Sequence, residues 1–341
     1  MKQLLVHIGT HKTGTTAIQN ALRANKKLLA KHDCTYVDEA YELSRRLKES
    51  GLPGAEFEAV KKAFNDLVNR APGKRVILSS EQFAGTILKN YTDSSFIAER
   101  LRAIFPGHKL SVIVYFRRQD RFIESAYTQF IQQGQSWSFD RFRDFADFSE
   151  FDWNTVVESY RKYFKVVDIH IFDRSLLAGG DVVIDFFTWL GLPTDRRLRI
   201  IQGSNYGFSR TAVEVARVGN SYLDDTAKQH LYTMLQSRDS RQSYDNNPFF
   251  SSQEREALLA HYRPANRKLA AVAGANLEDA FPSALTADSP GIDASAMAVD
   301  PDASVRLLID ICLQQHGSRR RRIMPNLIVR LKARLKQYAS W

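Results

Sequence analysis

Residues 3–16 read QLLVHIGTHKTGTT, an apolar run that leads through two glycines into a helical pattern. The apolar run at 3–8 predicts a short buried strand, and apolar residues recur at helical spacing from 15 to about 31. Gly9 and Gly14 lie between the two elements. A loop of this kind can bind phosphate, because glycines let the backbone amides converge on an anion at the start of a helix.

Strand patterns and helical patterns continue to alternate along the chain. We expect strands at 75–79, 110–116 and 166–172, and helices at 57–71, 94–105, 120–132, between 138 and 164, and at 180–190. Strands that alternate with helices predict a parallel sheet. The sequence therefore predicts an α/β protein with a three-layer, P-loop-like fold, in which helices flank a central parallel sheet, plus a helical C-terminal region.

The strand patterns end near residue 191, and the patterns that follow are helical. We expect a main domain, a linker rich in turn-forming residues and a basic amphipathic helical tail, which cover residues 1–281, 282–302 and 303–341. Within the main domain, residues 192–281 are predicted to form a helical lid or cover over the sheet.

The net charge of +10 is concentrated in the tail. Residues 311–341 carry eight basic side chains and no acidic ones, so the rest of the chain is nearly balanced. We therefore predict no nucleic-acid partner, since the basic character does not belong to the globular body. Leucines at helical spacing among the basic residues of 319–341 have two interpretations: a peripheral contact with an anionic membrane, or a helix packed on the body or on a partner subunit.

The compartment is predicted from the cysteines and the apolar runs. Cys34 and Cys312 give neither a disulfide framework nor a metal-ligand spacing, which favours a reducing cytoplasm. No segment has the pattern of a signal peptide, and none approaches the roughly 18 apolar residues of a membrane span. We expect a cytoplasmic protein, associated at most with the inner face of the membrane.

The glycine loop departs from the one that binds nucleoside triphosphates. Gly9 and Gly14 have its spacing, but Thr15 and Thr16 stand where that loop continues with lysine and then serine or threonine. The lysine is inside the loop, at Lys12. A triphosphate enzyme needs a hydroxyl and a carboxylate to hold Mg²⁺, whereas one lysine can stabilise the departure of a less charged sulfuryl group without metal. The alternatives are a degenerate nucleotide loop and an ordinary turn.

A second set of residues lies after the strand predicted at 110–116. Arg117 and Arg118 follow this strand, and Ser125 lies eight residues after Arg117 on the next helix. An arginine at the carboxyl end of a strand and a serine on the adjoining helix can hold a phosphate together at the edge where α/β folds bind ligands.

These motifs resemble those of bacterial sulfotransferases that use 3′-phosphoadenosine 5′-phosphosulfate, over about residues 1–275. The resemblance assigns the 5′-phosphosulfate to the loop made by Lys12, Thr13, Gly14, Thr15 and Thr16. It assigns the 3′-phosphate to Arg117 and Ser125. Similar segments are Ser79-Ser80-Glu81 and a late helix at 252–270, which contains Glu254-Arg255 and Asn266-Arg267-Lys268. A late Arg-Lys-Gly segment of the cytosolic relatives is missing, so the adenine contacts stay unassigned.

The resemblance implies in-line, metal-independent transfer of the sulfuryl group to a hydroxyl of a carbohydrate or glycan acceptor. Such transfer needs a base that takes the hydroxyl proton. We expect this base to be Glu81, with His11 as the rival because it lies beside Lys12. Arg118 has two interpretations, a charge near the 3′-phosphate or a surface salt bridge.

Two other classes of function stay open. A nucleoside-triphosphate-dependent kinase with a degenerate loop predicts nucleotide binding that depends on Mg²⁺. A non-catalytic basic module predicts that binding resides in residues 316–341 and survives loss of Lys12. The sulfotransferase predicts metal-independent binding of adenosine 3′,5′-bisphosphate that is lost without Lys12 or Arg117.

Overall fold

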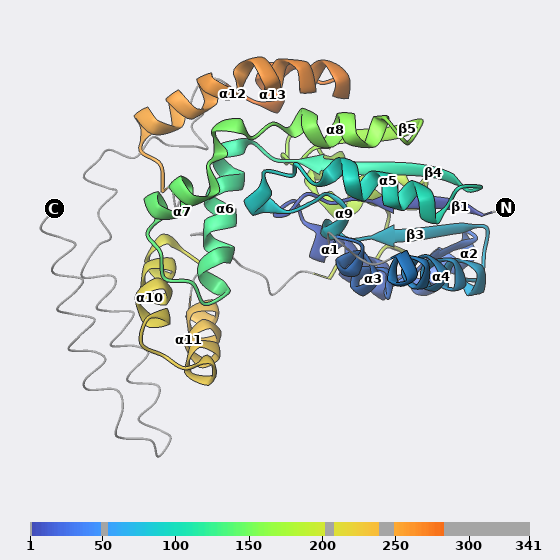
Figure 1. Cartoon of the computed structure of the whole chain (residues 1–341), viewed down its shortest axis with the longest axis horizontal. Helices are drawn as coiled ribbons and strands as arrows, with labels where there is room; N and C mark the ends of the chain where they lie inside the picture. Colours follow the sequence, from blue (N-terminus) through green and yellow to red (C-terminus); the bar gives the residue numbers. More distant parts are fainter. Residues whose placement is uncertain (1, 49–53, 202–207, 239–248, 283–341) are drawn as a thin grey trace, which may run out of the picture. The chain divides into compact units, whose positions relative to one another are not determined.

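A computed structural model describes residues 2–48, 54–201, 208–238 and 249–282 of the chain (Figure 1). Its strands are β1 Gln3–His7, β2 Cys34–Tyr36, β3 Arg75–Ser79, β4 Lys109–Phe116 and β5 Val166–Ile171. They form one sheet in the order β2-β3-β1-β4-β5, and every neighbouring pair is parallel. The predicted α/β fold with a central parallel sheet is confirmed.

Helices connect the strands and follow the last of them. They are α1 Thr15–Ala24, α2 Lys26–Lys31, α3 Ala40–Leu47, α4 Gly54–Arg70, α5 Ser94–Ile104, α6 Gln119–Gln132, α7 Phe139–Ala146, α8 Trp153–Arg161, α9 Val182–Trp189, α10 Arg210–Asn220, α11 Asp225–Arg238, α12 Ser252–Ala273 and α13 Leu277–Ala280. After α9 the described residues contain helices and no further strand, which confirms the predicted helical C-terminal region.

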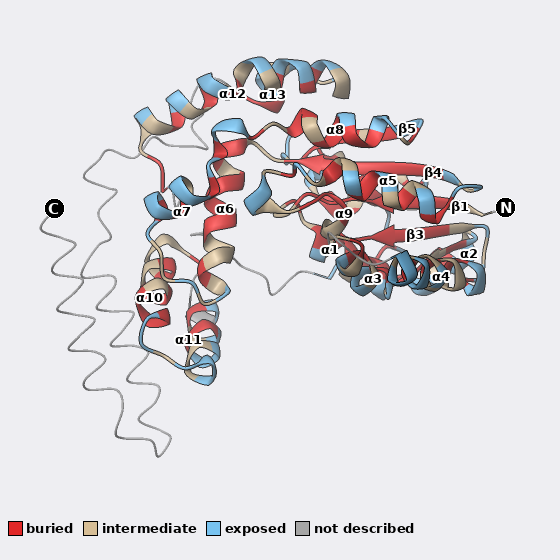
Figure 2. Ribbon diagram, in the orientation of Figure 1, coloured by how far each residue is buried: buried red, intermediate tan, exposed pale blue. Residues whose placement is uncertain are grey.

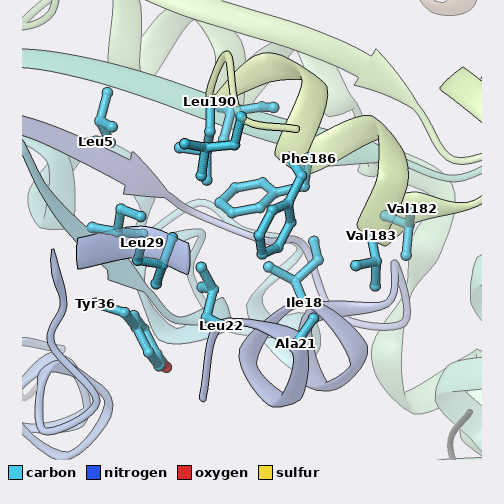
Figure 3. Close-up of a cluster of buried hydrophobic side chains, with 14 of the residues drawn as sticks. Leu5, Ile18, Ala21, Leu22, Leu29, Tyr36, Val182, Val183, Phe186 and Leu190 are labelled. Carbon is cyan, nitrogen blue, oxygen red and sulfur yellow. The ribbon is translucent and has the colours of Figure 1, made fainter. Parts of the chain in front are cut away.

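The sheet is apolar on both faces, as a sheet between two layers of helices must be. All residues of β4 after Lys109 are buried (Figure 2). On one face, side chains of α1 and α9 join Leu5 and Ile113 of the sheet in a single apolar cluster (Figure 3). α5 packs against α4 and α8, and right-handed crossovers put these three helices on the other face.

The chain connections determine where a ligand site is expected. After β1 the chain moves to β2 on one side of β1, and after β3 it crosses to β4 on the other side. Such a reversal of direction leaves a crevice at the carboxyl ends of the strands, where open α/β sheets bind ligands. β1, β3 and β4 end at His7, Ser79 and Phe116, so Lys12, Glu81 and Arg117 follow at this same edge.

The chain divides into two compact units. Among the described residues, the first contains those of 2–122, 146–201 and 261–282, which include all five strands, and the second contains those of 123–145 and 208–260. The predicted linker from residue 283 onward and the predicted tail lie outside the described residues. Among the helices of the described ranges, none has the length and apolar character needed to cross a bilayer.

Candidate functional site

The loop between β1 and α1 has an unusual backbone. The φ angle is +66° at Lys12 and +81° at Gly14, and it is not positive at the intervening Thr13. Left-handed residues in a turn can direct backbone N–H groups toward one side, which forms a concave site for anions. A left-handed lysine costs about 1–3 kcal/mol, and such strain is concentrated at functional sites. The loop therefore combines two left-handed residues with the start of a helix, and Lys12 lies within it; anion binding by this loop stays a prediction.

At the start of α1, backbone N–H groups receive no hydrogen bond acceptor from the side chain of the N-cap residue. Gly14 is the N-cap and has no side chain, so the N-cap residue itself makes no side-chain hydrogen bond to the first turn. The first helical bond runs from the Ile18 N–H to the Gly14 carbonyl, 3.1 Å away. The preceding N–H groups of the first turn therefore point out of the helix end and carry its partial positive charge. Thr15 is buried at this end, and Thr16 is exposed.

Side-chain hydrogen bonds fix the loop on the sheet. The Thr10 hydroxyl donates to the Tyr115 carbonyl of β4 at 2.5 Å, and the Thr13 hydroxyl donates to the Thr10 carbonyl at 2.6 Å. Both threonines are fully buried. Because the Thr13 hydroxyl is used inside the loop, only the backbone of Thr13 would be available to a ligand, whereas Lys12 is half-buried.

Gly14 also approaches α9 closely. A Cβ atom at Gly14 would lie 2.7 Å from Val182 Cγ1 and 3.2 Å from Phe172 Cε2. The position therefore requires glycine for two reasons, a left-handed backbone and a lack of space.

Alanine at Gly14 should destabilise the protein more than alanine at Gly191. Gly191 has a similar left-handed φ of +66°, but no atom lies within 4 Å of its Cβ position. We expect the backbone term alone, about 1 kcal/mol, for Gly191→Ala, and about 1–3 kcal/mol more for Gly14→Ala because a packed core must shift. Urea unfolding of the two variants measures the difference. Equal losses of unfolding free energy in the two variants would show that the close contact with α9 does not restrict the residue at position 14.

Arg117 extends from the end of β4 to the loop. Its Nη1 donates to the Lys12 carbonyl at 3.3 Å, and its guanidinium lies 5.6 Å from the centre of the Phe172 ring. The Arg117 carbonyl accepts from Trp153 Nε1 at 2.9 Å, which fixes the backbone at this point. Two of the predicted cofactor-binding residues, Lys12 and Arg117, are thus in direct contact although 105 residues separate them in the chain.

The other two residues of the predicted 3′-phosphate site have different surroundings. Arg118 forms a bidentate ion pair with the fully buried Asp120, at 2.7 and 2.9 Å. The ion pair is buried and so differs from the predicted surface salt bridge, and a role of Arg118 at the 3′-phosphate stays a prediction. Ser125 is buried on α6 and belongs to the second unit, so its position relative to the loop stays a prediction.

Glu81 follows β3 at the same edge of the sheet, in a short 3-10 turn at Glu81–Phe83. It is half-buried. Burial raises the pKa of Glu81 above its ordinary value, while its own backbone amide, the charge of Lys48 and a hydrogen bond from Tyr41 act in the opposite direction. Lys48 donates to Gln82 Oε1 at 2.9 Å, which fixes this lysine beside the turn. A glutamate with a raised pKa is suited to proton transfer near neutral pH.

His11 makes its contacts with Tyr91. The Tyr91 hydroxyl lies 3.3 Å from the His11 backbone nitrogen, whose N–H donates to it, and 3.0 Å from His11 Nδ1. Because the tyrosine oxygen accepts from the backbone, its own hydrogen is available to donate to Nδ1. Burial, with the charges of Lys48 and Lys12, lowers the pKa of His11 to about 3. His11 is therefore neutral at physiological pH and a weak base.

Sequence reasoning missed three residues of this edge. His7 ends β1 and is fully buried, Tyr91 is fully buried with a positive φ of 59°, and Lys48 is the C-cap residue that follows α3. A polar residue at the end of an apolar run was a signal for His7. Tyr91 and Lys48 come from a loop and a helix with no sequence pattern that links them to the glycine loop.

The late segment that resembles sulfotransferases is divided between the two units. In the first unit, the buried Asn266 and Gln119 exchange side-chain hydrogen bonds of 2.6 and 3.1 Å, next to Arg118 in the chain. In the second unit, Arg255 forms a buried ion pair with Glu124 at 2.7 Å. These residues therefore have structural contacts that explain why polar side chains are buried there.

Comparisons with known proteins do not assign a family. No protein-family model matches the chain. A curated protein of Archaeoglobus fulgidus, named only as an uncharacterized protein, is 28% identical over 164 residues. The match covers 46% of this chain and 44% of that protein, so it spans less than half the length of either. The relative's name mentions no ligand and no reaction, and the predicted activity therefore stays a proposal.

Proposed function

We propose that the chain is a sulfotransferase that moves a sulfuryl group from 3′-phosphoadenosine 5′-phosphosulfate to a hydroxyl of a carbohydrate or glycan. The observation that carries the proposal is the loop itself: a left-handed Lys12 and a left-handed Gly14 flank Thr13 at the uncapped start of α1. Such a loop provides converging amides for a phosphate and one amine for the group beside it.

The position of the amine favours sulfuryl transfer over phosphoryl transfer. In the triphosphate loop the lysine follows the second glycine, but here the side chain at that position is the buried Thr15. Lys12 therefore approaches a bound anion from within the loop. Its positive charge would offset the negative charge that develops on the bridging oxygen as the sulfur–oxygen bond breaks.

The second part of the proposal concerns the proton of the acceptor. As the acceptor oxygen bonds to sulfur, Glu81 would take the hydroxyl proton, and the adenosine bisphosphate would leave with the electrons of the broken bond. Burial raises the pKa of Glu81, so its carboxylate is a stronger base than an ordinary glutamate. His11 is the weaker candidate, because its pKa is about 3 and its Nδ1 faces the Tyr91 hydroxyl.

The direct test is a transfer assay with the labelled sulfuryl donor and a panel of glycans. We expect release of adenosine 3′,5′-bisphosphate that depends on the acceptor and is unchanged by a chelator. A parallel assay with labelled ATP and Mg²⁺ tests the kinase alternative. Phosphoryl transfer that the chelator abolishes, without sulfuryl transfer, would replace the proposal by the kinase function.

A further inference from the structure

Two buried polar atoms beneath the loop have no hydrogen-bond partner. Within the described part of the chain, His7 Nε2 and Thr15 Oγ1 make no hydrogen bond, although His7 is 0% and Thr15 7% exposed. Buried polar groups are bonded in the great majority of cases, because leaving one unbonded costs about 1–3 kcal/mol. Both atoms therefore need a partner that their surroundings must supply.

The two atoms meet at Gly9. A Cβ atom at Gly9 would lie 2.3 Å from Thr15 Oγ1 and 2.9 Å from His7 Nε2. The separation of these atoms is therefore at most the sum of the two distances, which one water molecule or a rotation of Thr15 can bridge. The φ of Gly9 is not left-handed, so the backbone does not require glycine there. Glycine leaves the space in which the histidine and the threonine approach each other.

The hydrogen-bond partners of His7 favour one of the two neutral forms of its ring. His7 Nδ1 lies 2.9 Å from Ser79 Oγ, and both side chains are fully buried. Within the described residues the Ser79 hydroxyl has no other partner, so donation of its hydrogen to Nδ1 is the arrangement that leaves this buried hydroxyl hydrogen bonded. The proton of the neutral ring is then on Nε2. Burial lowers the pKa of His7 to about 3, which keeps the ring neutral.

We propose that Ser79, His7 and Thr15 form a hydrogen-bonded relay that holds the Thr15 hydroxyl as a donor to the anion in the loop. Ser79 donates to Nδ1, and Nε2–H donates to Thr15 Oγ1 across the space beside Gly9. With its oxygen used as an acceptor, the Thr15 hydroxyl directs its own hydrogen to the ligand. His7 is a positioning residue, because it acts through Thr15. The inference rests on the proposed function of the loop as a phosphate site.

The first test uses the free protein and needs no ligand. Nitrogen-15 NMR of labelled histidine distinguishes protonated from unprotonated ring nitrogens, and the His7→Gln variant identifies the His7 signals. We expect an unprotonated Nδ1 and a protonated Nε2 that do not change between about pH 5 and pH 8, since the pKa lies far below that range. A proton on Nδ1 would overturn the relay and leave the proposed sulfotransferase activity untouched.

The second test measures calorimetric binding of adenosine 3′,5′-bisphosphate to two variants of His7. The amide nitrogen of glutamine can take the place of Nε2, whereas that of asparagine takes the place of Nδ1. We expect His7→Gln to bind like the wild type and His7→Asn to bind about tenfold more weakly, the effect of one lost hydrogen bond.

A double-mutant cycle with Thr15→Val separates the relay from a general loss of packing. In the Thr15→Val background, His7→Asn should cause no further loss of affinity. The relay would be overturned if His7→Gln and His7→Asn lost the same amount of affinity and if these losses added to the loss caused by Thr15→Val. Failure of the wild type to bind the bisphosphate would instead overturn the proposed function, and the NMR result would still decide the tautomer.

Discussion

Replacing Lys12 with alanine should reduce sulfuryl transfer by roughly 10²–10³-fold, the usual cost of removing one group that stabilises transition-state charge. Binding of adenosine 3′,5′-bisphosphate should weaken by about 10–100-fold, since a hydrogen bond to a charged group contributes about 1.5–3 kcal/mol. The larger effect on turnover is expected because the charge on the bridging oxygen develops only as the sulfuryl group leaves. Steady-state kinetics and calorimetry on the same preparations measure the two losses.

Lys74→Ala is the matched control for Lys12→Ala. Lys74 is exposed and precedes β3, at the edge of the sheet opposite to the loop, so this variant removes the same charge from the protein without touching the site. Its turnover and affinity should equal those of the wild type. If Lys12→Ala behaved like Lys74→Ala, the loop would not hold the donor, and binding that resides in residues 316–341 would become the better explanation.

Replacing Glu81 with glutamine should abolish most of the turnover and leave bisphosphate binding intact. We expect a loss of roughly 10²–10⁴-fold, the contribution of a positioned general base. Glu56→Gln is the control, because Glu56 is exposed in the first turn of α4. Loss of bisphosphate binding together with turnover would show that Glu81 has a structural function instead.

The pH dependence of kcat/KM gives a second measure of Glu81. Burial raises the pKa of Glu81, so the carboxylate is protonated at a higher pH than an ordinary glutamate. The rate should fall as the pH is lowered through this raised pKa, and the acid limb should lie above the ordinary value of 4.5. His11→Asn should keep this limb, whereas Glu81→Gln should remove it. The opposite pattern would identify His11 as the base.

The sheet could be predicted because its strands are buried on both faces. Runs such as Arg75–Ser79 and Lys109–Phe116 are apolar and bounded by turn formers, which is the clearest signal that a strand can give. The short edge strand β2 was missed, since Cys34–Tyr36 has too few residues to show a pattern.

The sequence pattern also failed to predict one helix boundary. The helix predicted from 15 to about 31 is two helices, α1 and α2, which meet at Asn25. The buried side chain of Asn25 donates to the Ala21 carbonyl and to the Arg199 carbonyl, both at 2.8 Å. The break therefore depends on a tertiary contact with a residue 174 positions away, which local spacing does not reveal.

The candidate site was predictable where its residues follow strands. Lys12, Glu81 and Arg117 come directly after β1, β3 and β4, and parallel strands bring such positions to one edge. The surroundings that tune these residues were not predictable. Tyr91 contacts His11 from a loop 80 residues away, and the burial that shifts the pKa values arises only when the chain has folded.

Calorimetric titration with adenosine 3′,5′-bisphosphate, compared with ATP plus Mg²⁺ and repeated with a chelator, tests the central claim most directly. The proposed function predicts tight binding of the bisphosphate, unchanged by the chelator and weakened in Lys12→Ala and Arg117→Ala. Preference for ATP that disappears with the chelator would contradict it, and would mean that the loop holds a nucleoside triphosphate despite the position of its lysine.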